Sequence, residues 1–197
     1  MSTPSQNQAL IVGLGNPGLE YAKNRHNVGF QCVDRLAAKH ALQFSRHQAK
    51  STLATGTIAG RRVILAKPLT YMNLSGQSVA QIARFYKIAP ADMLVVCDDL
   101  DLPLGRIRLR PGGSSAGHRG MTSVIDWLGS DDFPRMRLGI GRPAHNGTVD
   151  FVLGNFNGDD AITMDRTLDR AVAAVVVFLT EGIDAAMNQF NAEPRQA

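Results

Sequence analysis

The segment from Ala9 to Phe30 constrains the fold most, because it joins an apolar run to a glycine-rich turn and then to a helical pattern. The run from Ala9 to Val12 is typical of a buried strand. The turn that follows reads Gly-Leu-Gly-Asn-Pro-Gly over residues 13–18, which matches the G-x-G-x-x-G fingerprint of dinucleotide-binding loops. The same turn carries Asn16, and His26 follows eight residues after its last glycine. The segment therefore predicts a strand, turn and helix unit that allows two functional interpretations.

The first interpretation, a dinucleotide site, lacks its expected context. The third glycine should lie in a helix that begins in the turn, and an acid should end the next strand about 20 residues later. Pro17 directly precedes that glycine, and the acid at the required distance, Asp34, falls among the helically spaced Phe30, Val33 and Leu36. We therefore expect no dinucleotide at this turn.

Strand-like and helical patterns alternate along the whole chain, which predicts an α/β fold. We expect one domain over residues 9–191 with a central mixed, mostly buried, twisted sheet flanked by helices on both faces, a disordered N-terminal tail over 1–8 and a C-terminal tail over 192–197. A hairpin should turn at Ala59-Gly60, and residues 143–150 are interpreted as a loop near the site. The expected strands cover 9–14, 51–58, 61–67, 93–97, 106–110 and 135–141. The expected helices carry Phe30 to Ala37, Val79 to Tyr86 and Met121 to Leu128, run from Asp160 to Leu179, and include a short one after Gly182.

Charge and cysteine content restrict the class of protein. The chain has 197 residues and a net charge of +4, which favours a polyanionic partner without requiring one. Cys32 and Cys97 lie in apolar surroundings and read as reduced core thiols. No apolar stretch is long enough to span a bilayer, and no signal peptide pattern is present. We expect a soluble cytoplasmic protein.

Polar side chains follow three of the predicted strands at their carboxyl ends, where ligands bind in open α/β sheets. These side chains are Asn16, Asn73 and Asp98, and His26 lies at the start of the first long helix. A carboxylate that orients an imidazole, with amides that hold a carbonyl group, can form a general-base site. Each residue also has a structural interpretation, as a helix cap, a turn residue or a packed histidine. Spacing alone leaves both interpretations open.

The acidic run Asp98, Asp99 and Asp101 suggests a metal site, but no further carboxylate cluster completes a coordination shell. Arg106 and Arg108 would also compete for these carboxylates. We therefore expect no metal.

A second glycine-rich segment, residues 113–117, formally matches the G-x-S-x-G nucleophile elbow around Ser115. The elbow requires a buried apolar strand before it, whereas residues 106–110 alternate arginine with apolar residues. Backbone N–H groups beside arginines favour an anion cradle, and the alternative is a solvated strand face. Four further arginines follow in the same region and add positive charge to it, namely Arg119, Arg135, Arg137 and Arg142.

The assembled motifs resemble those of bacterial peptidyl-tRNA hydrolases over nearly the whole chain, from about Ala9 to Phe190. They are VGLGNPGLEYAKNRHNVGF, KPLTYMNLSGQSV, VVCDDLDLPLGRIRLRPGG, GHRG, RLGIGRP and DFVLGNF. The resemblance implies a monomer that cleaves the ester between a peptide and the 3′ end of tRNA, without metal or cofactor. It implies that His26 is the catalytic base and that Asp98 orients it. Further roles are implied for substrate-binding residues (Asn16, Tyr21, Met72, Asn73) and for basic residues that contact tRNA phosphate (Arg108, Arg110, Arg137).

The chain departs from the family pattern at Arg119, where the family usually has Asn after the histidine of the glycine loop. Ser114, Ser115 and Ala116 also replace more common glycines and a histidine. We expect Arg119 to contact substrate, either by taking over a hydrogen bond or by adding a tRNA contact. The departure leaves open the alternative of a non-catalytic RNA-binding protein with the same fold. A serine esterase that uses Ser115 is the third hypothesis.

Overall fold

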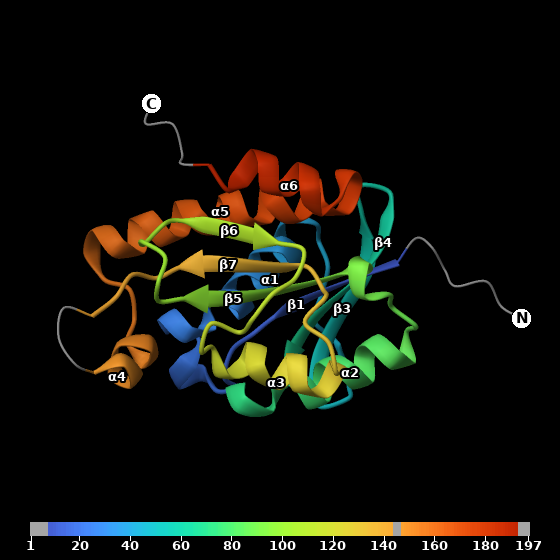
Figure 1. Ribbon diagram of the computed structural model, residues 1–197, viewed down its shortest axis with the longest axis horizontal. Coiled ribbons are helices and arrows are strands. Elements are labelled where there is room, and N and C mark those ends of the chain that lie inside the picture. The colour runs from blue at the N-terminus through green and yellow to red at the C-terminus, as the bar shows by residue number, and fades with distance from the viewer. Residues whose placement is uncertain (1–7, 144–146, 193–197) are drawn as a thin grey trace, which may run out of the picture.

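The chain folds around one seven-stranded mixed sheet with the strand order β2-β3-β4-β1-β5-β7-β6 (Figure 1). The computed structural model describes residues 8–143 and 147–192. Strands β4, β1, β5 and β7 run parallel, and antiparallel strands lie at both edges. The strands are β1 (Gln8–Gly13), β2 (Arg46–Gln48), β3 (Ser51–Ile58), β4 (Arg61–Pro68), β5 (Met93–Asp99), β6 (Ile107–Arg110) and β7 (Arg135–Gly139). This arrangement confirms the expected fold class.

Helices cover both faces of the sheet, with α5 and α6 on one side and α2 and α3 on the other (Figure 1). The α-helices are α1 (Val28–Lys39), α2 (Ser75–Phe85), α3 (Arg119–Leu128), α4 (Thr148–Leu153), α5 (Gly158–Glu181) and α6 (Ile183–Phe190). Short 3-10 helices are η1 (Leu19–Tyr21), η2 (Arg25–Asn27), η3 (Met72–Leu74) and η4 (Pro90–Asp92). None of the described helices combines the length and the apolar character that crossing a membrane requires.

Strand alternation divides the apolar residues into two cores. In β1, Ala9 and Ile11 pack in the core that includes α1, α5 and α6, whereas Leu10 and Val12 pack in the core of α2 and α3. Successive side chains of a strand point to opposite faces, so a sheet covered on both faces needs a continuous apolar run. This requirement explains why the run at the start of the chain does not alternate with polar residues.

The first two glycines of the opening turn let backbone and side chains approach closely. A Cβ on Gly13 would lie 2.2 Å from the carbonyl oxygen of Gly29, so α1 rests directly on the end of β1. A Cβ on Gly15 would meet the ring of Phe30 at 2.7 Å. These contacts explain the glycine spacing through packing of α1 on the sheet.

The expected hairpin is confirmed, with Ala59 and Gly60 as its two turn residues. The sequence missed β2, and it missed α4, because residues 148–150 begin a helix instead of continuing a loop. Residues 144–146 of that expected loop lie outside the described residues. The expected tails also lie outside them, except that Gln8 starts β1 and residue 192 is described. Both cysteines are buried free thiols, as expected, and burial raises the pKa of Cys32 to about 12.

Candidate active site

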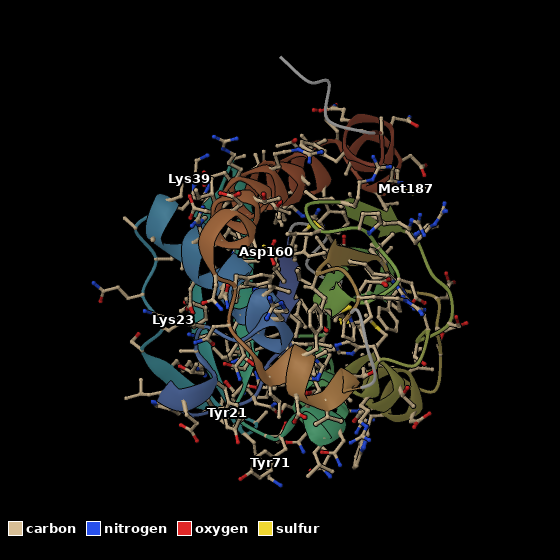
Figure 2. The ribbon with its side chains drawn as sticks, turned by 90° about the vertical axis from the view of Figure 1, so that its left-hand side faces the viewer. Tyr21, Lys23, Lys39, Tyr71, Asp160 and Met187 are labelled. Atoms are coloured by element: carbon tan, nitrogen blue, oxygen red, sulfur yellow. The ribbon has the colours of Figure 1, made fainter. Side chains whose placement is uncertain are left out.

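A cavity of about 610 Å³ opens where β1, β4 and β5 end. The arrowheads of β5 and β7 point toward α4, which borders this end of the sheet (Figure 1). Figure 2 looks onto the same end, with Tyr71 at the outer edge of the molecule. The cavity is lined by Asn16, His26, Tyr71, Met72, Asn73, Asp98, Asp99, Leu100, Asp101, Ala116, Gly117, His118, Arg119, Arg137, Thr148, Val149, Val152 and Leu153. The strand-end residues singled out in the sequence therefore meet at one cavity.

Asp98 lies at the floor of this cavity and accepts a hydrogen bond from His26. The distance from His26 Nδ1 to Asp98 Oδ1 is 2.8 Å, and only 3% of the Asp98 side chain is exposed. Asp98 continues the side of β5 that carries Leu94 and Val96, which is the side covered by α1. Because η2 immediately precedes α1, His26 reaches Asp98 from that side.

His118 approaches the same carboxylate from the opposite face of the sheet, and the sequence reasoning missed it as a site residue. Its Nε2 lies 2.9 Å from Asp98 Oδ1, and its ring centroid lies 5.1 Å from that of His26. His118 is also the N-cap of α3, because its Nδ1 accepts a hydrogen bond from the Met121 backbone N–H at 3.0 Å. The signal available in the sequence was its place directly before the α3 pattern.

These contacts define which ring nitrogens carry protons. His118 Nδ1 accepts from Met121, so its hydrogen lies on Nε2 and points to Asp98. His26 donates from Nδ1 to the same carboxylate, which leaves the lone pair of its Nε2 unprotonated. Burial by itself raises the pKa of Asp98, but the charge and hydrogen bond of His118 and then those of His26 outweigh burial and hold this pKa well below its usual range. Asp98 is thus held as a carboxylate that accepts from both imidazoles.

Asn16 is held by two elements so that one end of its amide is fixed. Its Oδ1 accepts from the Met72 backbone N–H at 2.9 Å, and its own backbone exchanges two 2.9 Å hydrogen bonds with the side chain of Asn27. With Oδ1 engaged, the Nδ2 group remains as the donor that Asn16 offers at the cavity wall. Asn27 is a second residue that the sequence reasoning missed, although it directly follows His26.

Other residues singled out in the sequence lie at different depths. Met72 is buried, and Asn73 is exposed at the cavity in η3. Tyr21 lies in η1 and is absent from the described lining of the cavity. The η3 residues Met72 and Asn73 are therefore brought to the site, whereas Tyr21 is not part of its wall.

The four arginines expected to contact substrate or tRNA differ in exposure. Arg119 is exposed at the cavity in the first turn of α3, and no described residue pairs with its guanidinium. Arg108 and Arg110 point outward from β6. Arg137, opposite Arg108 on β7, is buried, lies 3.2 Å from Asp99 and donates to the Ser114 carbonyl at 2.6 Å. Two of the arginines expected to contact phosphate are thus free at the surface, and the third supports the glycine loop.

The cluster His26, Asp98 and His118 has the composition of a metal site, with ligand atoms within 4.8 Å of one another. A metal on His118 Nε2 would move the hydrogen of a neutral ring to Nδ1, where it would face the Met121 N–H. The hydrogen-bonded network therefore fits these residues better than a bound ion does.

The nucleophile-elbow pattern around Ser115 is not part of this cluster. Ser115 is absent from the described cavity lining, and its carbonyl closes the turn to the His118 N–H at 3.1 Å. In that turn Ala116 and Gly117 have φ angles of 48° and 76°, so the segment is a tight loop leading into α3.

Comparisons with known proteins agree over almost the whole chain. The peptidyl-tRNA hydrolase family profile matches residues 10–197. The peptidyl-tRNA hydrolase of Symbiobacterium thermophilum is 56% identical over 92% of this chain and 98% of its own length. That of Desulforamulus reducens is 51% identical over 92% of this chain and 88% of its own length. The crystal structure of peptidyl-tRNA hydrolase from Acinetobacter baumannii superposes with a TM-score of 0.90 at 39% identity, covering 97% of this chain and 98% of that one. The chain belongs to the peptidyl-tRNA hydrolase family.

Proposed function

We propose that this protein hydrolyses the ester bond between peptide and tRNA in peptidyl-tRNA, using water activated by the His26–Asp98 pair. The observation that carries the proposal is the oriented imidazole, in which Nδ1 donates to a buried carboxylate and Nε2 is left to accept a proton at a cavity. Family membership supplies the substrate class.

The reaction needs three contributions from these residues. His26 Nε2 takes a proton from water as its oxygen attacks the ester carbonyl, and Asp98 stabilises the imidazolium that forms. The Nδ2 group of Asn16 donates to the carbonyl oxygen as negative charge develops there, and Asn73 contacts the water or the substrate beside it. The imidazolium then returns its proton to the departing 3′ oxygen of tRNA. No covalent intermediate is required, because an ester is already a good acyl donor.

The tRNA body binds through charge outside the cavity. Arg108 and Arg110 contact phosphates, and Arg137 adds positive potential while it holds the loop of Ser114. Arg119 contacts substrate at the cavity rim, and Met72 forms part of the cavity wall. Tyr21, in η1 outside the described lining, contacts the part of the substrate that extends beyond the cavity. The protein acts as a monomer in the cytoplasm, where its substrate arises.

A non-catalytic RNA-binding protein would not need an oriented base. The hydrogen bonds of His26 and of Asn16 converge on one cavity, which favours hydrolysis over binding alone.

The test is peptide release from a purified peptidyl-tRNA. We expect His26→Ala and His26→Asn to lower kcat by at least about 100-fold, because each removes the general base, with tRNA affinity by fluorescence anisotropy within about twofold. His26→Asn is the matched variant because it retains a donor for Asp98. Ser115→Ala should keep full activity, and labelling of Ser115 by a fluorophosphonate would instead support the esterase. Undiminished turnover in His26→Ala would disprove the site assignment.

A further inference from the structure

Arg25, the residue before His26, connects the turn that carries His26 to α4. Its guanidinium carbon lies 4.4 Å from the ring centre of Phe151 in α4 and 4.9 Å from that of Phe156. Its Nη1 donates to the carbonyl of Asn155 at 2.7 Å, and its backbone N–H donates to the carbonyl of Gly154 at 3.0 Å. One side chain therefore binds the end of α4 and the segment that leads to α5.

The surroundings of Arg25 indicate that the aromatic contacts dominate. Only 11% of its side chain is exposed, and its Nε is buried with no hydrogen-bond partner among the described residues. Its ion-pair partner Asp160 lies at 3.5 Å and is half exposed, so this pair is weakened by solvent. A planar guanidinium stacked over aromatic rings is an arrangement in which arginine and lysine differ strongly.

Helix α4 has six residues, and isolated helices of that length do not form in water. Phe151 of this helix faces Arg25, whereas Thr148, Val149, Val152 and Leu153 line the cavity. The helix thus depends on contacts such as that of Arg25 for its position, and the cavity depends on the helix for one wall.

We propose that Arg25 is a positioning residue that holds α4 as the apolar wall of the cavity and so determines how tightly the acyl part of the substrate binds. The part of the proposal that concerns substrate rests on the proposed function. The part that concerns α4 stands on the contacts alone. Because α4 supplies wall residues and no reacting group, loss of Arg25 should raise KM and leave kcat nearly unchanged.

The test compares Arg25→Lys with the wild type by hydrogen exchange and by kinetics. The amides of Phe151 in α4 and of its C-cap Gly154 should exchange faster by about tenfold, because the stacked contact is lost while the backbone bond from residue 25 remains. KM should rise by about fivefold to tenfold with kcat within about twofold. The matched control is Arg35→Lys, since Arg35 pairs with Asp165 and Asp169 of α5 and does not line the cavity. This control should change neither α4 exchange nor KM.

Phe151→Leu provides a second route, which also applies if Arg25→Lys does not fold. It should reproduce both effects, and the double variant should be no worse than Arg25→Lys alone, because that change already removes the contact with Phe151. Unchanged exchange in α4 would overturn the proposal whatever the activity. A fall in kcat without a change in KM would also overturn it, since Arg25 would then act on His26 directly. Faster exchange in α4 in an enzyme that hydrolyses no peptidyl-tRNA would support the role in α4 and reject the proposed function.

Discussion

At the scale of single residues, the site depends on one carboxylate oxygen that accepts from two histidines. Asp98 Oδ1 binds His26 on one side and His118 on the other, so the carboxylate cannot rotate without breaking a hydrogen bond. His118 is itself fixed by the Met121 N–H. The start of α3 therefore fixes His118, His118 fixes Asp98, and Asp98 fixes the orientation of the His26 ring.

His118 combines two roles that substitution can separate. His118→Ala should lose about 1 kcal/mol of stability because the N-cap of α3 is gone. His118→Asn should retain stability because Asn caps helices well. Both variants should lower kcat by about tenfold, because Asp98 loses the donor that orients it. Urea unfolding and single-turnover kinetics check the two effects. Normal kcat in His118→Asn would mean that His118 serves α3 alone.

The sequence predicted His26, Asp98, Asn16 and Asn73 as neighbours because carboxyl ends of parallel strands meet at one edge. It did not predict the partners that hold them. His118 is 20 residues from Asp98 in the chain, and Arg25 is more than 120 residues from its aromatic partners. Such contacts arise from tertiary packing, which no local pattern encodes.

At the scale of elements, the turn between β3 and β4 contains a strained residue. Ala59 has a φ of 48° and Gly60 one of 80°, so both occupy the left-handed region required by a two-residue hairpin turn. Asn tolerates this region better than Ala does. The hairpin therefore forms with one unfavourable turn residue.

Ala59→Asn should stabilise the protein. Relief of the left-handed strain should contribute about 0.5–1 kcal/mol, which corresponds to a rise in Tm of about 1–4 °C for a chain of this length. Peptidyl-tRNA turnover should not change, since Ala59 does not line the cavity. Calorimetry measures the shift, and an unchanged or lower Tm would show that the turn is not strained.

The sequence missed the shortest strand and the shortest α-helix. The three residues of β2 and the six of α4 show no periodic pattern of their own. Pairing with β3 defines the first, and contacts with η2 hold the second. Longer elements such as α5 were predicted because their apolar stripe repeats over several turns.

At the scale of the whole molecule, positive charge is distributed unevenly. Several arginines form hydrogen bonds inside the protein and so contribute little charge to the surface. Arg135, for example, is buried and donates to the carbonyls of Asp131, Gly113 and Phe133. Arg108 and Arg110 project from the edge strand β6 into solvent. The net charge of +4 therefore describes the surface proposed to bind tRNA less well than this local distribution does.

Arg108→Ala should weaken tRNA binding and reduce the slope of log K against log salt by about 1, because one phosphate contact is lost. The matched control is Arg62→Ala, an exposed arginine on β4, three strands from β7 in the sheet order. Anisotropy titrations at several salt concentrations give both slopes. Equal slopes for the two variants would exclude Arg108 from the tRNA contact.

The contact between Gly13 and Gly29 has a consequence for how this enzyme tolerates change. Backbone meets backbone there, so no side chain acts as a spacer between α1 and the sheet. Hydrophobic residues elsewhere in the core can exchange volume without moving the start of α1, and with it His26. The separation of base and carboxylate is thereby less sensitive to changes in core composition, whereas a larger residue at either glycine would push α1 away from the sheet and change it.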